Sequence, residues 1–196
     1  MKIILASASK NRQEIFDIAQ IPVTLMPTKV DEKQVKQTDL KKRALAIARL
    51  KMAAAKSNFQ DDRSQTIIIA ADGFNVCQGK ILDKPHSLGQ AREMLDLLSG
   101  NKTTFYSALI MYHCAKLKTF ETIVTTDYWF RNLSNEEITD YITTTDVLQY
   151  SAAYSPLNTK AVSFGRKIAG SLTGFTHSMP MDIVIPKLIE WGWKKT

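Results

Sequence analysis

Two serines and an arginine near the start of the chain have the types and spacing that could bind a phosphate group. Ser7, Ser9 and Arg12 come directly after the apolar run at residues 2–6. If that run is a strand and a helix begins after Ser9, free backbone N–H groups, hydroxyls and a guanidinium gather at one point, and such groups bind phosphates. An ordinary helix cap with a surface arginine has the same pattern. The spacing leaves both interpretations open.

Three carboxylates are placed to suit a hard cation or a general base. Asp31 and Glu32 are adjacent in the polar stretch 27–37, and carboxylate oxygens are ligands that Mg²⁺ prefers. Asp72 follows the buried-strand pattern at 66–71, and ligands of α/β folds bind at the carboxyl ends of strands. Burial there favours a base, whereas a nearby metal favours the charged form. A solvated acid pair and an aspartate bonded to its own turn are the structural alternatives.

Two lysines could add positive charge to the same region. Lys51 falls on the apolar-facing register of a predicted helix, where a lysine either extends its ammonium to solvent or reaches an anion. Lys84 precedes Pro85, which favours extended backbone and could direct the ammonium toward a ligand. The structural alternative for Lys84 is a surface lysine.

The elements that must position these residues follow from the hydrophobic periodicity. The patterns predict strands at 2–6, 23–26 and 66–71, an extended segment at 74–77 that turns at 78–79 into a strand at 80–82, and two long strands within 103–130 that turn near 115–118. They predict helices at 10–19, 39–57, 87–98, 134–143 and 180–191. Residues 144–179 are expected to form short strands and loops. Because strands and helices alternate early and a hairpin follows, the sequence predicts an α/β fold with a mixed sheet.

Composition excludes several classes of protein. The 196 residues, 44% hydrophobic and 23% charged, are typical of one globular domain. Two cysteines cannot build a disulfide framework or a four-ligand zinc site. No apolar run approaches the length of a membrane span, and the N-terminus lacks the features of a signal peptide, so we expect a cytoplasmic protein. Walker A, G-x-G-x-x-G, H-E-x-x-H and G-x-S-x-G motifs do not occur.

The excess positive charge is concentrated in the first third of the chain. Residues 1–60 hold twelve Lys and Arg against five Asp and Glu, which equals the whole formal net charge of +7. Such a segment suits an anionic partner, although a solvated basic helix face explains it equally well. The basic helix predicted at 39–57 lacks interleaved aromatic residues, which argues against nucleic acid as the partner.

The order of the short motifs is more specific than any one of them. They are Ser-Ala-Ser-x-x-Arg at 7–12, Val-Asp-Glu at 30–32, Ala-x-x-Lys at 48–51, Ala-Asp at 71–72, Asp-Lys-Pro at 83–85, Leu-Ser-Gly at 98–100 and Met-Pro-Met at 179–181. This string resembles the Maf family of nucleoside triphosphate pyrophosphatases over nearly the whole chain.

The resemblance implies an activity, a fold and roles for individual residues. Members cleave nucleoside triphosphates to a monophosphate and pyrophosphate with a divalent metal, Mg²⁺ or Mn²⁺. They have an elongated mixed β-sheet flanked by helices, with two lobes around a cleft in a single domain (here 1–196), similar to the ITPase fold, and a homodimer is expected. The implied roles are phosphate binding for Ser7, Arg12, Lys51 and Lys84, metal binding for Glu32 and Asp72, and activation of the attacking water by Asp72.

The chain also departs from the family's pattern. Lys10 and Asn11 stand where the family has proline and arginine, and Gly73 replaces a polar residue beside Asp72. The segment 149–154 replaces Asp-Lys-Ala-Gly-Ala-Tyr, and Leu157 stands where a polar residue is expected. A catalytically weakened or inactive nucleotide-binding protein is therefore the alternative function. Thr-Phe-Tyr at 104–106 resembles the 7-methyl-GTP branch of the family more than the dTTP/UTP branch.

Overall fold

The computed structural model describes residues 1–60, 64–158 and 160–194, and these residues form a seven-stranded mixed sheet. The strands run in the order β2-β1-β3-β5-β6-β7, with β4 paired to β3. Their bounds are β1 Lys2–Leu5, β2 Thr24–Leu25, β3 Thr66–Cys77, β4 Lys80–Leu82, β5 Lys102–His113, β6 Lys118–Phe130 and β7 Gly165–Ala169. β1 pairs in parallel with both β2 and β3, whereas β4 is antiparallel to β3 and β7 to β6. The predicted α/β class with a mixed sheet is confirmed.

All the α-helices except α5 begin within one residue of the start that the sequence predicts. They are α1 Lys10–Ile18, α2 Leu40–Asn58, α3 Leu88–Leu98, α4 Asn135–Thr144, α5 Leu172–His177 and α6 Met181–Glu190, with short 3-10 helices η1 Glu32–Gln34, η2 Val147–Gln149, η3 Ser151–Ala153 and η4 Ala161–Ser163. The side chains of Ser9, Asp39 and Ser87 accept hydrogen bonds from the first turns of α1, α2 and α3. These bonds satisfy N–H groups that have no partner within the helix.

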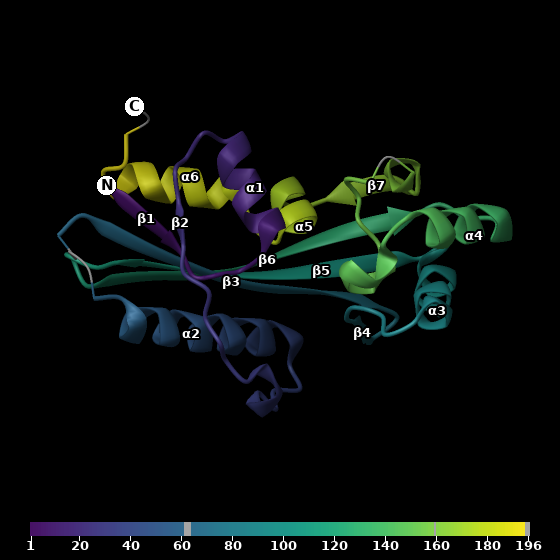
Figure 1. Ribbon diagram of the computed structural model, residues 1–196, viewed down its shortest axis with the longest axis horizontal. Helices are drawn as coiled ribbons and strands as arrows, with labels where there is room; N and C mark the ends of the chain where they lie inside the picture. The colour runs from purple at the N-terminus through teal and green to yellow at the C-terminus, as the bar shows by residue number, and fades with distance from the viewer. Residues whose placement is uncertain (61–63, 159, 195–196) are drawn as a thin grey trace. The chain divides into compact units, whose positions relative to one another are not determined.

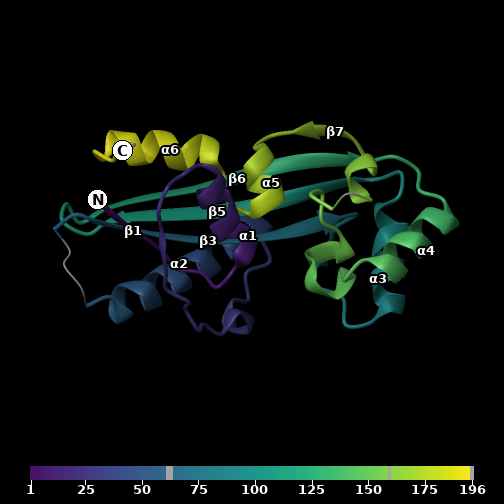
Figure 2. The ribbon, with the colours of Figure 1, turned by 45° about the horizontal axis from the view of Figure 1, so that its top comes forward.

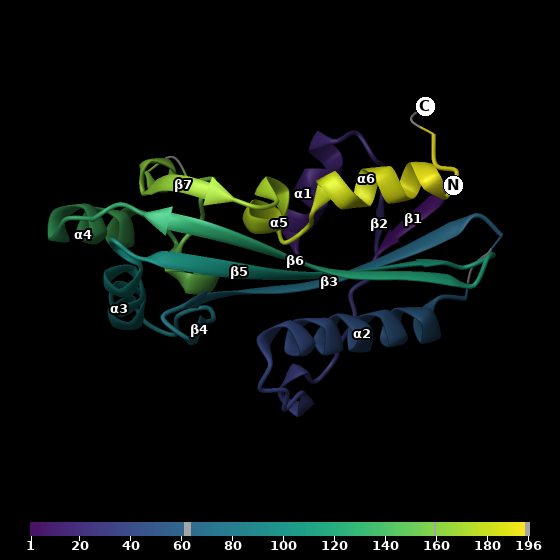
Figure 3. The ribbon, with the colours of Figure 1, turned by 180° about the vertical axis from the view of Figure 1, so that it is seen from behind.

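The chain divides into two compact units, and the first contains residues 1–73, 107–124 and 173–196. In this unit α2 lies on one face of the sheet, whereas α1 and α6 lie on the opposite face (Figures 1 and 3). Figure 2 shows the same separation in a tilted view. The hydrophobic core on the α1 and α6 face includes Phe16, Ile69, Leu109, Val184 and Trp191. These residues hold the carboxyl end of β1 and the start of α1 in place.

The second unit contains residues 74–106 and 125–172. Its core is a set of buried aromatic rings in contact with one another: Tyr128, Phe130, Tyr141, Tyr154 and Phe164. Inside this core the hydroxyl of Tyr154 lies 2.7 Å from that of Tyr128. Gly165 leaves room for it, because a Cβ there would lie 1.8 Å from the Tyr128 hydroxyl. The predicted organisation as one domain with two lobes around a cleft stays a prediction.

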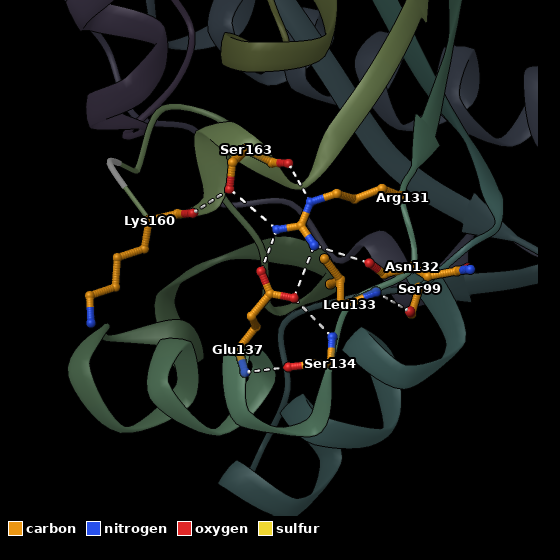
Figure 4. A network of polar contacts seen from close by, with 8 residues as sticks. All are labelled: Ser99, Arg131, Asn132, Leu133, Ser134, Glu137, Lys160 and Ser163. Atoms are coloured by element: carbon orange, nitrogen blue, oxygen red, sulfur yellow. Dashed lines mark hydrogen bonds and ion pairs between the residues drawn. The ribbon is translucent and has the colours of Figure 1, made fainter.

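Arg131 fastens three segments of the second unit together (Figure 4). Its guanidinium forms a bidentate ion pair with Glu137 in the first turn of α4, and its Nε donates to the carbonyl of Ser163 in η4. Glu137 also accepts from the backbone N–H of Ser134, and the Ser134 side chain accepts from the N–H of Glu137, so the two residues form a capping box at the start of α4. These hydrogen bonds lower the pKa of Glu137 to about 2, with that to Arg131 the largest cause.

Two expectations about the elements are wrong. Residues 144–179 contain the helix α5 as well as short 3-10 helices and the strand β7. More important for function, β3 does not end at Asp72 but continues through Asp72 and Gly73 to Cys77. The pair Asp72-Gly73 indicated a turn after the strand. In the structure Lys51 forms an ion pair with the Asp72 carboxylate, which offsets the cost of burying this charge inside a strand. Among the described residues, the helices are all too short or too polar to cross a membrane.

The Arg131–Glu137 pair predicts a pH-dependent contribution to stability. Glu137 has a folded pKa below its ordinary value of 4.5, so the pair stabilises the folded state above pH 4.5, and the contribution disappears as the pH falls toward 2. We expect Glu137→Gln to lower the melting temperature at pH 7 by about 1–3 °C, since the pair is partly exposed. Thermal unfolding over a pH series should show this difference shrink below pH 4.5. The exposed Glu93 of α3 provides the control, and an equal loss in Glu93→Gln would contradict the assignment.

Candidate active site

Lys51 joins two of the predicted site carboxylates in the first unit. Its Nζ lies 2.7 Å from Oδ1 of Asp72 and 2.8 Å from Oε1 of Glu32. The side chains of Lys51 and Asp72 are only 14% and 9% exposed, whereas that of Glu32 is 48% exposed. The sequence allows the Lys51 ammonium either to extend to solvent or to reach an anion, and in the structure it contacts anionic carboxylates. The ammonium holds two carboxylates at one point.

Arg12 and Ser7 form the second half of the cluster. Nη1 of Arg12 donates to Oγ of Ser7 over 3.2 Å, and the same Oγ accepts from the backbone N–H of Ser9. Burial lowers the pKa of the Arg12 guanidinium, and the negative charges of Asp72 and Glu32 oppose that shift. The Nε of Arg12 is buried and has no hydrogen-bond partner among the described residues. A buried guanidinium with an unused donor can bind an anionic ligand.

The sheet register brings these distant residues together. Leu5 of β1 pairs with Ile69 of β3, so the chain beyond β1 and the residues before Asp72 continue side by side. Ser7 follows directly after β1, and α1 then begins with Ser9 as its cap, which places Arg12 in the first turn. Helix α2 supplies Lys51 from the face that also buries Ala44, Ile47, Ala48, Met52 and Ala55. The fold thus gathers five residues that the sequence separates: Ser7, Arg12, Glu32, Lys51 and Asp72.

Asp31 positions Glu32, a role that the sequence analysis did not assign. The Asp31 carboxylate accepts from the backbone N–H of Lys33 and from the side-chain amide of Gln34, which caps η1 and fixes the turn that carries Glu32. Asp31 was considered as a cation ligand, but in the structure its oxygens serve its own turn. This role could have been predicted from the sequence, because an aspartate in a turn often accepts a hydrogen bond from the backbone N–H two residues later.

Lys84 belongs to the second unit and is exposed. It follows β4 in a loop that η3 holds in place, since the N–H of Ala152 donates to the carbonyl of Asp83 and Oγ of Ser151 to that of Leu82. Ala152 adopts φ 60° and ψ 22°, a left-handed conformation, at the position where the family pattern has glycine. The phosphate-binding role of Lys84 stays a prediction.

The other residues that depart from the family pattern differ in their exposure to solvent. Lys10 and Asn11 are exposed at the start of α1, and Leu157 is 49% exposed in the second unit. Gly73 follows Asp72 inside β3, where it provides no side chain next to the carboxylate. None of the four contributes a hydrogen-bonding side chain to the described cluster around Lys51.

The donor set suits a divalent cation that also contacts a ligand. Glu32 and Asp72 direct one oxygen each at a common positive charge, the ammonium of Lys51. Within the part of the chain that the structure describes, no group of three or more His, Cys, Asp or Glu side chains could hold a metal. A cation held by two carboxylates would complete its coordination with waters and phosphate oxygens, as Mg²⁺ commonly does.

These features define an α/β protein with a buried acid–lysine–arginine site at the end of its first strand. A family model described as "Maf-like protein" matches residues 2–176. The chain is 33% identical to a dTTP/UTP pyrophosphatase of Pyrococcus abyssi, over 98% of this chain and 97% of that protein. It is 29% identical to the protein of the same name from Carboxydothermus hydrogenoformans, over 98% and 100%. The chain belongs to the Maf family.

A further relative and one solved structure extend the comparison. The Moorella thermoacetica dTTP/UTP pyrophosphatase is 31% identical over 78% of this chain and 77% of that protein. The Staphylococcus aureus Ham1 protein aligns over 98% of this chain and 100% of that structure, with a TM-score of 0.49 and 14% identity, and nothing below depends on this likeness. The three relatives are named for the dTTP/UTP branch, so the predicted resemblance to the 7-methyl-GTP branch gains no support from them.

Removing Lys51 should destabilise the protein because it leaves two carboxylates facing each other without their shared cation. We expect Lys51→Met to reduce the free energy of unfolding by about 2–3 kcal/mol, less than for a fully buried pair because Glu32 is half exposed. The double variant Lys51→Met/Asp72→Asn should recover part of this loss, since one of the two charges is gone. Chemical denaturation of both variants measures the coupling, and purely additive losses would contradict it.

The left-handed backbone of Ala152 gives a second prediction. Because glycine adopts this conformation without steric cost, Ala152→Gly should leave stability unchanged or raise it, by up to about 1 kcal/mol. The exposed Ala53 in α2 is the matched control, where the same substitution should cost about 1 kcal/mol. Thermal denaturation distinguishes the two positions, and equal losses at both would show that the conformation of Ala152 carries no strain.

Proposed function

We propose that this protein hydrolyses a nucleoside triphosphate to the monophosphate and pyrophosphate. The observation that carries the proposal is the contact of Lys51 with both Asp72 and Glu32 in a mostly buried cluster that also contains Arg12. The cluster combines donors for phosphate oxygens with carboxylates that can bind a metal or a water. Full-length relatives named dTTP/UTP pyrophosphatase support the same reaction.

The substrate's negative charge explains why so many polar groups are needed. A triphosphate binds where several positive groups offset its charge, and that charge becomes redistributed as the bond to the leaving pyrophosphate breaks. Arg12 and Lys51 supply cations, and Ser7 supplies a hydroxyl next to the guanidinium. For Lys84 the family resemblance supports a further contact with the phosphates. The positive charge of the first third of the chain therefore requires no nucleic acid.

In the proposed reaction a water oxygen attacks the α-phosphorus, and the bond from that phosphorus to the oxygen that bridges to the β-phosphorus breaks. Pyrophosphate leaves, and the water's oxygen stays on the nucleoside monophosphate. Asp72 is buried and carries a carboxylate in reach of the Lys51 ammonium, so it can orient the water and accept its proton. Lys51 and Arg12 hold the phosphate oxygens while the charge moves to the leaving group.

Glu32 and Asp72 are the residues that would hold a divalent metal, Mg²⁺ or Mn²⁺. Such an ion neutralises charge on phosphate oxygens and polarises the phosphorus that is attacked. The two carboxylates are oxygen ligands, which these hard cations prefer.

The names of the relatives make dTTP and UTP the first substrates to test. The residues behind the 7-methyl-GTP prediction have structural contacts in the second unit. Oγ1 of Thr104 donates to Asp127 over 2.6 Å, Phe105 is buried, and the ring of Tyr106 packs against Phe74. A panel of triphosphates that includes 7-methyl-GTP decides between the two branches.

Asp72→Asn tests the reaction directly. We expect the variant to lose pyrophosphate release by at least about 100-fold, because an amide cannot take the proton of the attacking water. Its melting temperature should stay nearly unchanged, since the amide oxygen can still accept a hydrogen bond from Lys51. Pyrophosphate release is measured with each triphosphate in the presence of Mg²⁺ or Mn²⁺.

Asp17→Asn, on the exposed side of α1, is the matched control and should keep full activity. Equal activity of Asp72→Asn and the wild type would remove Asp72 from the mechanism. Thermal stabilisation of the wild type by a triphosphate, without turnover of any member of the panel, would instead favour the alternative of an inactive nucleotide-binding protein.

A further inference from the structure

We propose that the Lys51 ammonium occupies the metal position in the nucleotide-free protein and must leave it when a divalent ion binds. The proposal rests on the proposed function for the metal position at Glu32 and Asp72 and for the identity of the later ligand. Its structural basis is that one nitrogen lies within hydrogen-bond distance of Oε1 of Glu32 and Oδ1 of Asp72 at once. The carboxylates of Glu32 and Asp72 are also the groups that would bind the divalent metal in the proposed function.

A metal and the ammonium cannot share this position. Mg²⁺ binds oxygen ligands at about 2.0–2.1 Å, so it would lie between the two carboxylates where Nζ lies now. Two positive charges at such a short separation in a mostly buried place repel each other strongly. The side chain of Lys51 is a flexible four-carbon chain, so the ammonium can move away while α2 stays in place.

If a metal displaces the Lys51 ammonium, the metal must bind before Lys51 can contact the triphosphate. With Lys51 in place, the positive charges of Arg12 and Lys51 balance the negative charges of Asp72 and Glu32, so the cluster presents no net charge to an incoming anion. When a metal takes over the carboxylates, Lys51 becomes free to bind a phosphate oxygen. We therefore expect the metal to increase the affinity for the triphosphate, and by linkage the triphosphate then increases the affinity for the metal by the same factor.

The first experiment measures Mn²⁺ binding without nucleotide, by calorimetric titration and by the electron paramagnetic resonance signal of free Mn²⁺. We expect Lys51→Met to bind Mn²⁺ about tenfold more tightly than the wild type, a typical size for coupling between ligands. Lys42→Met removes an exposed lysine from the same helix and should leave the affinity unchanged. Adding Glu32→Gln to Lys51→Met should remove the gain, which assigns it to this site.

The second experiment follows Lys51 itself in the wild-type protein. Acetylation with a limiting amount of acetic anhydride, read by peptide mass spectrometry, reports how available each ammonium group is. We expect Mn²⁺ to raise the acetylation of Lys51 at least threefold relative to Lys42. This measurement requires no variant, so it decides the question even if Lys51→Met does not fold.

The outcomes separate this proposal from the proposed function. Tighter Mn²⁺ binding by Lys51→Met together with greater acetylation of Lys51 supports displacement, whether or not any triphosphate is hydrolysed. Equal or weaker binding by Lys51→Met overturns it, because Lys51 then does not oppose the metal. Unchanged acetylation also overturns it, because the ammonium then stays on the carboxylates. Loss of activity in Asp72→Asn bears only on the reaction.

Discussion

Two carboxylates and two cations in a mostly buried place must balance each other, and this constraint shapes the first unit. Asp72 lies inside a buried strand, where an isolated negative charge would be costly. Lys51, which extends from α2, offsets that cost with its positive charge. Arg12 adds a second positive charge from α1. Because each charge depends on the others, any ligand that contacts one of them changes the balance of all four.

The same balance explains why the cluster suits a ligand better than a purely structural role. A structural ion pair satisfies its donors. In the part of the chain that the structure describes, however, the Nε of Arg12 is buried without a hydrogen-bond partner, and the Lys51 ammonium contacts two acids at once. Buried donors that lack a partner in the free protein are costly unless a ligand satisfies them. Among the residues described, the charged side chains of the first unit therefore leave one buried donor unsatisfied where four elements, α1, η1, α2 and β3, contribute to the cluster.

Much of the fold follows from local signals in the sequence. Ser9, Asp39 and Ser87 predict helix starts because their side chains satisfy N–H groups within four residues, which requires no knowledge of the rest of the chain. The continuation of β3 through Asp72 could not be predicted in this way, since it depends on Lys51, 21 residues earlier. Helix α5 was missed for a related reason, because six residues are too few to produce a helical period.

The order of the short motifs along the chain predicted the residues of the site, but not the distances between them. No local rule connects Ser7, Glu32, Lys51 and Asp72, and each has an ordinary structural explanation when taken alone. Their contacts arise from the parallel pairing of β1 with β3 and from α2 lying across one face of the sheet (Figure 1). Asn11 and Leu157, which depart from the family pattern, are exposed and lie outside this charge balance, whereas Ala152 is buried and Gly73 follows Asp72 directly. Substitutions at such exposed positions leave the four charges in place.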